Sequence, residues 1–287
     1  MLIFKRICLI VVFLGCAGAA WATPLDDLKI GASARVIEVV DGDTVILDAA
    51  IDDAIQVRLV GLQAPKLPLG RKGFRPWPLA EDSKYALEVL TLNKRVTLRF
   101  GGARMDRHGR HLAHLFLDDG TWVQGQMLER GMARVYTFPD NRAVTDDMYA
   151  LERQARDAGR GIWAHPFYAV RAATPEALDR LVGTFQVIEG RVLDAAQVRG
   201  TVYLNFGGNW RDDFTVTLDS RTRRDFLKSN RDPLSFEGKY IRVRGWLKKR
   251  NGPALSATHP AQIELIDPES GANQDLGSVR PESPLPR

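Results

Sequence analysis

The sequence predicts a mixed β/α protein built from two small five-stranded barrels. Its 287 residues exceed the length of a typical single domain. Short apolar and β-branched runs bounded by turn dipeptides indicate strands rather than long helices. One order of elements, three strands, a helix and two further strands, occurs twice along the chain, and this is the order of a small barrel of the oligonucleotide-binding (OB) type. We therefore expect two domains.

The first 22 residues have the pattern of a signal peptide. Two basic residues precede the apolar run Ile7–Ala20, which ends in the small-residue cleavage pattern Ala20-Trp21-Ala22. We expect an exported protein, periplasmic or secreted, that begins at Thr23. A lipid-modified Cys16 is the less favoured alternative. No transmembrane segment is expected, because a span needs about 20 apolar residues and no run reaches that length comfortably.

The positions of the cysteines exclude several classes of mechanism. The two cysteines, Cys8 and Cys16, both lie in the predicted signal peptide. The exported protein would then have no thiol, which excludes disulfides, thiolate metal sites and cysteine nucleophiles.

The first predicted domain covers residues 34–166. A turn at Asp41-Gly42 joins its first two strands, and a loop rich in Pro, Gly and cations follows the third. Helices are expected from Pro78, over Trp122–Arg130, and from an N-cap at Thr145 to Gly159. The five strands are expected at Ala34–Val40, Thr44–Leu47, Ile55–Leu62, Arg95–Phe100 and His111–Leu117.

The second predicted domain, an OB-like barrel, covers residues 184–266. A linker with a short helix, 167–183, precedes it, and a disordered tail, 267–287, follows. The helix is expected over Ser220–Lys228, with a short extra strand at Ala254–Ala257. The five strands are expected at Thr184–Leu193, Thr201–Phe206, Phe214–Leu218, Tyr240–Lys248 and Gln262–Ile266.

Positive charge is concentrated in one stretch of each predicted domain. The stretch Arg58–Arg110 has 12 Lys and Arg against 4 Asp and Glu, and Arg199–Arg250 has 13 against 6. Such stretches suit a polyanion, because cations that replace condensed counterions supply much of the affinity for nucleic acid. We expect DNA or RNA as the partner, although a solvated basic surface would leave the same pattern.

Five motifs along residues 34–166, taken together, are specific enough to indicate one protein family. In their order and spacing they resemble the staphylococcal nuclease (thermonuclease, SNase-like) family. The motifs are Asp41-Gly42-Asp43-Thr44-Val45, Val57-Arg58-Leu59-Val60-Gly61-Leu62, Asp106-Arg107-His108-Gly109-Arg110, Gly131-Met132-Ala133-Arg134-Val135 and Gly159-Arg160-Gly161-Ile162-Trp163.

The resemblance implies a set of roles. In such enzymes carboxylates hold a calcium ion, two arginines bind the scissile phosphate and a glutamate activates water. By position, Asp43 is the first metal ligand, Arg58 and Arg110 are the phosphate clamp, and Tyr136 or Phe138 stacks on a base. Planar guanidinium groups suit this task because each meets two oxygens of a phosphate at once.

The sequence departs from the family pattern at two of these positions. Where the pattern has a second aspartate ligand and the glutamate base, this chain has Gln63 and Lys66. Calcium affinity depends on ligand charge, so we expect a weak or absent calcium site, to which Gln63 offers only a carbonyl oxygen. The Lys66 ammonium then substitutes for the metal, and binding without efficient cleavage is expected. Alternatively the loop re-forms the site, with Asp41 or a residue of the loop moving in.

Two further features concern the rest of the chain. The strand Tyr240–Lys248 alternates, so that Arg242, Arg244 and Trp246 share the face opposite the apolar one, which suits a base stacked between cations. An ordinary barrel wall with solvated arginines and a covered tryptophan is equally compatible, and the ligand of this domain stays unknown. His111 and His114 are expected to point to opposite sides of their strand and to be exposed.

Three functions remain after these observations. The first is an exported phosphodiesterase for DNA or RNA, weakened at its metal site. The second is a non-catalytic protein that binds nucleic acid or another phosphate compound in the same pocket. The third is a structural or partner-binding protein of the cell envelope in which Arg58 and Arg110 have no remaining role.

Overall fold

The computed structural model of the chain describes residues 24–267. The predicted signal peptide lies outside the described residues, and so does the predicted tail apart from Asp267. No helix in the described range is both long enough and apolar enough to cross a membrane.

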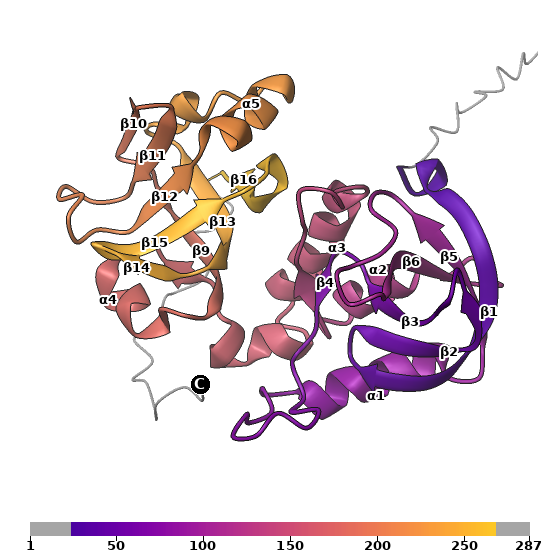
Figure 1. Ribbon diagram of the computed structural model, residues 1–287. Helices are drawn as coiled ribbons and strands as arrows, with labels where there is room; N and C mark the ends of the chain where they lie inside the picture. Colours follow the sequence, from indigo (N-terminus) through magenta and orange to yellow (C-terminus); the bar gives the residue numbers. More distant parts are fainter. Residues whose placement is uncertain (1–23, 268–287) are drawn as a thin grey trace, which may run out of the picture.

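Five strands of the N-terminal part close into a barrel (Figure 1). β1 is long because it serves two neighbours, pairing with β5 over its first half and with β2 over its second half. β3 and β6 run parallel, and the other neighbouring pairs run antiparallel. The strands are β1 (Lys29–Asp41), β2 (Thr44–Ile51), β3 (Ala54–Leu59), β5 (Arg95–Phe100) and β6 (His111–Leu117), in the order β1-β2-β3-β6-β5.

Three helices and a small sheet pack against this barrel. The small sheet pairs β4 (Leu62–Gln63) with β7 (Arg134–Val135). The helices are α1 (Ala80–Thr91), α2 (Val123–Glu129) and α3 (Thr145–Asp157). The expected N-cap of α3 is wrong: Val144 is the cap, and the Thr145 hydroxyl instead donates to the Arg142 carbonyl oxygen at 2.6 Å.

The C-terminal part has two sheets and two short helices. Their orders are β10-β11-β12-β15-β14 and β16-β13-β9-β8. The predicted strands Thr184–Leu193 and Tyr240–Lys248 each end early, because the chain passes near their C-terminal ends from one sheet to the other. The elements are β8 (Arg171–Ala172), α4 (Pro175–Leu178), β9 (Phe185–Arg191), β10 (Asp194–Val198), β11 (Thr201–Asn205), β12 (Thr215–Leu218), α5 (Ser220–Lys228), β13 (Tyr240–Trp246), β14 (Lys248–Arg250), β15 (Gly252–Ala257) and β16 (Ile263–Leu265).

Short 3-10 helices connect these elements. Three of them close the N-terminal part or lead out of it, and three belong to the C-terminal part. They are η1 (Pro24–Asp27), η2 (Gly161–Ala164), η3 (Pro166–Tyr168), η4 (Asp179–Leu181), η5 (Pro233–Phe236) and η6 (Pro260–Gln262).

The buried apolar residues form two separate clusters, one inside each part of the chain. The stretch expected as a linker contains the short helix α4, but it also contributes β8, which pairs with β9. Ala173 and Leu178 of this stretch are buried in the C-terminal cluster. The connection is therefore short, and most of residues 171–181 pack with the C-terminal part.

Candidate functional site

A tight turn carries two carboxylates into the N-terminal part. β1 ends at Asp41 and β2 begins at Thr44, so that Gly42 and Asp43 form the turn. A Cβ on Gly42 would lie 2.0 Å from the Ser83 hydroxyl oxygen of α1, which is why only glycine fits. Asp41 and Asp43 are 4% and 0% exposed. Both acids therefore need partners within the protein.

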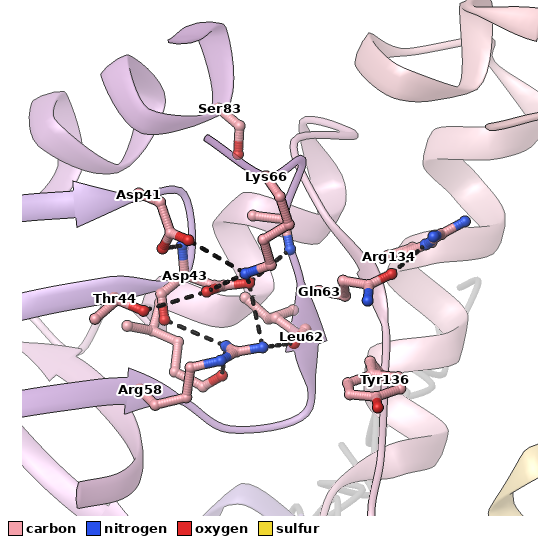
Figure 2. A network of polar contacts seen from close by, with 12 residues as sticks. Asp41, Asp43, Thr44, Arg58, Leu62, Gln63, Lys66, Ser83, Arg134 and Tyr136 are labelled. Atoms are coloured by element: carbon pink, nitrogen blue, oxygen red, sulfur yellow. Dashed lines mark hydrogen bonds and ion pairs between the residues drawn. The ribbon is translucent and has the colours of Figure 1, made fainter. Parts of the chain in front are cut away.

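Lys66 is the principal partner of both acids (Figure 2). Its ammonium nitrogen lies 2.6 Å and 2.8 Å from the two carboxylate oxygens of Asp43. The same nitrogen lies 3.2 Å from Oδ2 of Asp41. The three donors of the ammonium are thus directed at carboxylates. A positive charge therefore lies between the two acids.

Arg58 closes the same cluster from β3. Its Nη2 lies 3.2 Å from Oδ2 of Asp43 and donates to the Leu62 carbonyl oxygen at 2.5 Å. Its Nη1 donates to the carbonyl oxygens of Leu59 at 2.6 Å and Asp43 at 3.2 Å. Within residues 24–267 its Nε has no such partner. Arg58 therefore joins the Asp43 turn to the strand β4 and keeps one donor for another group.

The charges shift the two carboxyl groups in opposite directions. Burial alone would raise the pKa of Asp43, but Arg58 and Lys66 outweigh it, so this pKa lies well below its usual range. Burial and the neighbouring charge of Asp43 raise the pKa of Asp41. Asp43 is therefore the charged partner of the two cations, and Asp41 is the acid that takes up a proton first.

Arg110 is placed apart from this cluster. It directly precedes β6, in which Leu112 is the register partner of Arg58. Its Nε donates to Oδ2 of Asp106 at 2.8 Å, and its Nη2 lies 2.7 Å from the same oxygen. The structure thus brings Arg58 and Lys66 together on Asp43, whereas Arg110 lies just before the adjoining strand β6 and pairs with Asp106. Asp106 was not foreseen as this partner, although it lies only four residues away.

Gln63 does not face the acids. Its amide oxygen accepts a hydrogen bond from Nε of Arg134 at 2.9 Å, across the β4–β7 pair. Arg134 is buried, and burial lowers its pKa to about 10. The amide oxygen of Gln63, which the sequence suggested as a metal ligand, therefore accepts a hydrogen bond from the buried guanidinium group of Arg134.

The donor set does not fit a calcium ion. Calcium takes 6 to 8 oxygens, mostly from carboxylates and carbonyl groups. Here Oδ2 of Asp43 already receives Lys66, Arg58 and the Ala64 N–H. No group of three or more His, Cys, Asp or Glu side chains with metal-binding geometry occurs within residues 24–267. Asp43 and Gln63 are thus committed to other cations.

The predicted stacking residues lie beside β4. Tyr136 follows β7, and its N–H bonds the Gly61 carbonyl oxygen, next to the residue that anchors Arg58. Its ring meets Phe138 edge to face at 4.8 Å and Phe185 at 5.0 Å. Nε1 of Trp246 donates to the Tyr136 hydroxyl at 3.2 Å. Four aromatic rings from both parts of the chain therefore form one cluster.

The expected open face with Arg242 and Arg244 is wrong. Arg242 is 8% exposed and Arg244 is 1% exposed. Arg242 pairs with Glu189. Arg244 contacts both carboxylate oxygens of Glu152 on α3 at 3.0 Å, and it contacts Glu264 at 2.7 Å. Arg244 is covered because α3 of the N-terminal part packs over it.

Glu152 is a residue that the sequence analysis missed. Its Oε2 accepts the Val135 N–H, while Arg244 donates to the Val135 carbonyl oxygen at 3.2 Å. The pair thus satisfies the free edge of β7, which carries Arg134 and pairs with β4. The signal was present in α3, where Glu152 shares one face with the buried Met148 and Ala155.

The two histidines of β6 are buried, not exposed as expected. His111 and His114 are 1% and 3% exposed. The His111 ring bonds the Ile51 carbonyl oxygen, and Nδ1 of His114 accepts from Nε1 of Trp122. Burial lowers the pKa of His114 to about 3. Both rings are structural.

Comparison with known proteins assigns the N-terminal part. The family model described as staphylococcal nuclease homologue matches residues 56–165. The thermonuclease of Staphylococcus intermedius is 30% identical over 133 residues, which are 46% of this chain and 77% of that protein.

Two further relatives agree. An uncharacterized endonuclease of Escherichia coli O157:H7 is 30% identical over 131 residues, 45% of this chain and 76% of that protein. Endonuclease YncB of Bacillus subtilis strain 168 is 30% identical over 132 residues, 45% of this chain and 60% of that protein. These matches agree with the closed barrel of the N-terminal part and with the ion pair of Arg58 and Asp43. This chain belongs to the staphylococcal nuclease family.

Proposed function

We propose that this protein binds phosphodiesters of DNA or RNA without calcium and cleaves them slowly or not at all. One observation carries the proposal: the Lys66 ammonium lies 2.6 Å and 2.8 Å from the oxygens of Asp43 and 3.2 Å from Asp41. A fixed positive charge thereby takes the position that a metal ion needs. The nuclease family of the chain supports nucleic acid as the ligand.

The charges at the site suit binding more than hydrolysis. Hydrolysis needs a group that accepts a proton from water, and an ammonium has no lone pair to do so. Both oxygens of Asp43 are engaged by cations. For an incoming phosphate, Nε of Arg58 and the donors of Arg110 that Asp106 does not use remain. Guanidinium groups of this kind bind phosphate strongly.

A weakened nuclease is the second candidate, and Asp41 favours it. Its raised pKa places this carboxyl nearer to neutral pH than an ordinary aspartate, which is a property of general bases. If Asp41 activates water, cleavage is slow but real, and it does not require an added metal ion. The change Asp41→Asn then abolishes cleavage while it leaves phosphate binding in place.

A double change tests the proposal. Gln63→Asp with Lys66→Glu restores acidic groups at the two positions where this chain departs from its family. We expect the double variant to cleave plasmid DNA and RNA in calcium and to lose this activity when a chelator is added. The native protein should cleave slowly or not at all, with or without calcium. The single change Lys66→Gln is the matched control, since it removes the ammonium without adding an acid. Native cleavage as fast as that of the double variant would show that Lys66 does not impair the site.

The architecture of the C-terminal part supports a second proposed barrel of the OB type. Its β12 and β15 run parallel, as β3 and β6 do in the N-terminal barrel. β9 with β10 and β13 with β14 each provide one bent strand that joins the two sheets. We assign residues 184–266 to this barrel and residues 34–166 to the nuclease domain.

Export is proposed from the first 22 residues. If the segment is a signal peptide, cleavage follows Ala22 and the mature chain starts at Thr23. Mass spectrometry of the protein from periplasmic and secreted fractions measures its N-terminus. Recovery of the full chain from the cytoplasm alone would contradict export. A chain that begins at a lipid-modified Cys16 would show instead that the protein is anchored to a membrane by lipid.

A further inference from the structure

The C-terminal part contributes a half-exposed tryptophan beside the nuclease site. Trp246, the last residue of β13, is 44% exposed, although it belongs to a residue type that is usually well covered. Its hydrogen bond to the Tyr136 hydroxyl and its edge-to-face contact with Phe185 hold the indole in place. The exposed ring is therefore fixed rather than free to fold back.

Trp246 is connected to Arg58 of β3 by a short series of contacts. Arg58 donates to the carbonyl oxygen of Leu62, and Tyr136 donates its N–H to the carbonyl oxygen of the neighbouring Gly61. Figure 2 shows Tyr136 beside β4, on the same side as Gln63. Tyr136 thus contacts both Gly61, which precedes the Leu62 anchor of Arg58, and Trp246.

Two unpaired cations follow the tryptophan. Lys248 and Arg250 of β14 are exposed, and neither forms an ion pair with another residue of the described range 24–267. Lys249, which alternates with them, pairs with Asp179 at 3.0 Å. Because side chains alternate along a strand, Lys248 and Arg250 lie on one side of β14, which begins two residues after Trp246. An aromatic ring followed by two free cations thus borders the site.

We propose that Trp246, Lys248 and Arg250 form a subsite for single-stranded nucleic acid. An exposed ring can stack on an unpaired base of any sequence, while cations spaced along the strand meet the backbone phosphates. A duplex hides the faces of its bases and cannot use the ring. The inference rests on the proposed function, because the strand enters from the phosphate site.

The first test measures the contribution of the ring. Anisotropy of a fluorescein-labelled oligothymidylate of about 12 nucleotides, within the usual range for such domains, reports affinity. Trp246→Ala is expected to weaken binding by about 5-fold to 150-fold, the loss of one base–aromatic stack. Tyr240→Ala is the matched control, since Tyr240 is 39% exposed at the opposite end of β13, and it should leave the affinity unchanged. Trp246→Phe should retain most of the binding.

The second test measures the cations. Lys248→Ala with Arg250→Ala should reduce the slope of log affinity against log salt by about 1.4, which is two phosphate contacts on a single strand. Arg221→Ala with Arg224→Ala on α5 is the control, because both side chains are exposed and lie outside β14. A merely structural role of Lys248 and Arg250 would leave this slope unchanged.

The outcomes separate this inference from the proposed function. If the oligothymidylate binds, weakens with Arg110→Ala and is indifferent to Trp246→Ala, the subsite is wrong and the proposed function stands. If it weakens with Trp246→Ala but not with Arg110→Ala, the subsite stands and the phosphate site is wrong. Native protein that binds no oligothymidylate overturns both. A duplex of the same length that binds equally well overturns the single-strand assignment.

Discussion

The two arginines proposed to contact phosphate differ in what else depends on them. Arg58 holds three backbone carbonyl oxygens and the buried Asp43, whereas Arg110 holds Asp106 at a partly exposed position. The Gln63 and Lys66 departures could be identified from the sequence, because they are single positions in a local motif. That Gln63 turns toward Arg134 could not, because the two residues are 71 positions apart.

Single changes at the two arginines should therefore separate stability from binding. Arg58→Ala leaves a buried carboxylate and several carbonyl oxygens short of donors, and we expect the free energy of unfolding to fall by roughly 2–4 kcal/mol. Arg110→Ala breaks a partly exposed pair and should cost at most about 1 kcal/mol. Urea unfolding measures both, and salt-dependent binding to single-stranded DNA should be weakened by each. A stable Arg58→Ala protein would contradict the contacts described for Arg58.

At the scale of elements, strands were predictable where the signal is local. The turn at Asp41-Gly42 and the apolar run His111–Leu117 identify strands that the structure contains. β4 and β7 have two residues each, too few to show any period. Alternation also placed Arg244 on the face opposite the apolar one, but it carries no information about what covers that face. The helix α3 covers it, and this contact joins residues 92 positions apart.

The contact between Arg244 and Glu152 is expected to hold β7 in place. Arg244→Met removes the two 3.0 Å contacts of the buried Glu152 and leaves it only the longer ion pair of 3.6 Å with Arg156, so the free energy of unfolding should fall by about 3–5 kcal/mol. The double change Arg244→Met with Glu152→Met removes both charges and should recover part of this loss, which a double-mutant cycle in urea measures. The exposed pair Lys249 and Asp179 is the control, with a coupling below about 1 kcal/mol. Equal coupling in the two cycles would contradict a special role for the buried pair.

At the scale of the whole molecule, the two parts meet over buried polar groups. His259 of the C-terminal part is 1% exposed and shares a hydrogen bond of 2.8 Å with the Thr137 hydroxyl of the N-terminal part. Burial, with a smaller contribution from Arg142, lowers the pKa of His259 from 6.5 to about 4. The length of the chain and its repeated order of elements predicted two domains, but such a junction depends on tertiary contacts that no local pattern records.

The junction should make stability depend on pH in a defined window. Between pH 6.5 and about 4 the unfolded chain binds a proton at His259 that the folded chain does not, so stability is full above pH 6.5 and falls as the pH is lowered. One such group contributes up to about 1.4 kcal/mol per pH unit. His259→Gln should reduce the slope of the unfolding free energy against pH by that amount. The exposed His108→Gln should not, and an equal reduction there would contradict the assignment.

The lysine side chain at the acidic turn has a consequence for how the protein responds to its surroundings. A metal ion exchanges with the medium, and its occupancy follows the concentration outside, but an ammonium attached to the backbone has a constant local concentration. When the calcium concentration around the protein changes, the charge at this turn therefore stays the same. A chelator, which removes a bound metal ion from a protein, would leave this charge in place, so the ligand binding proposed above should not change.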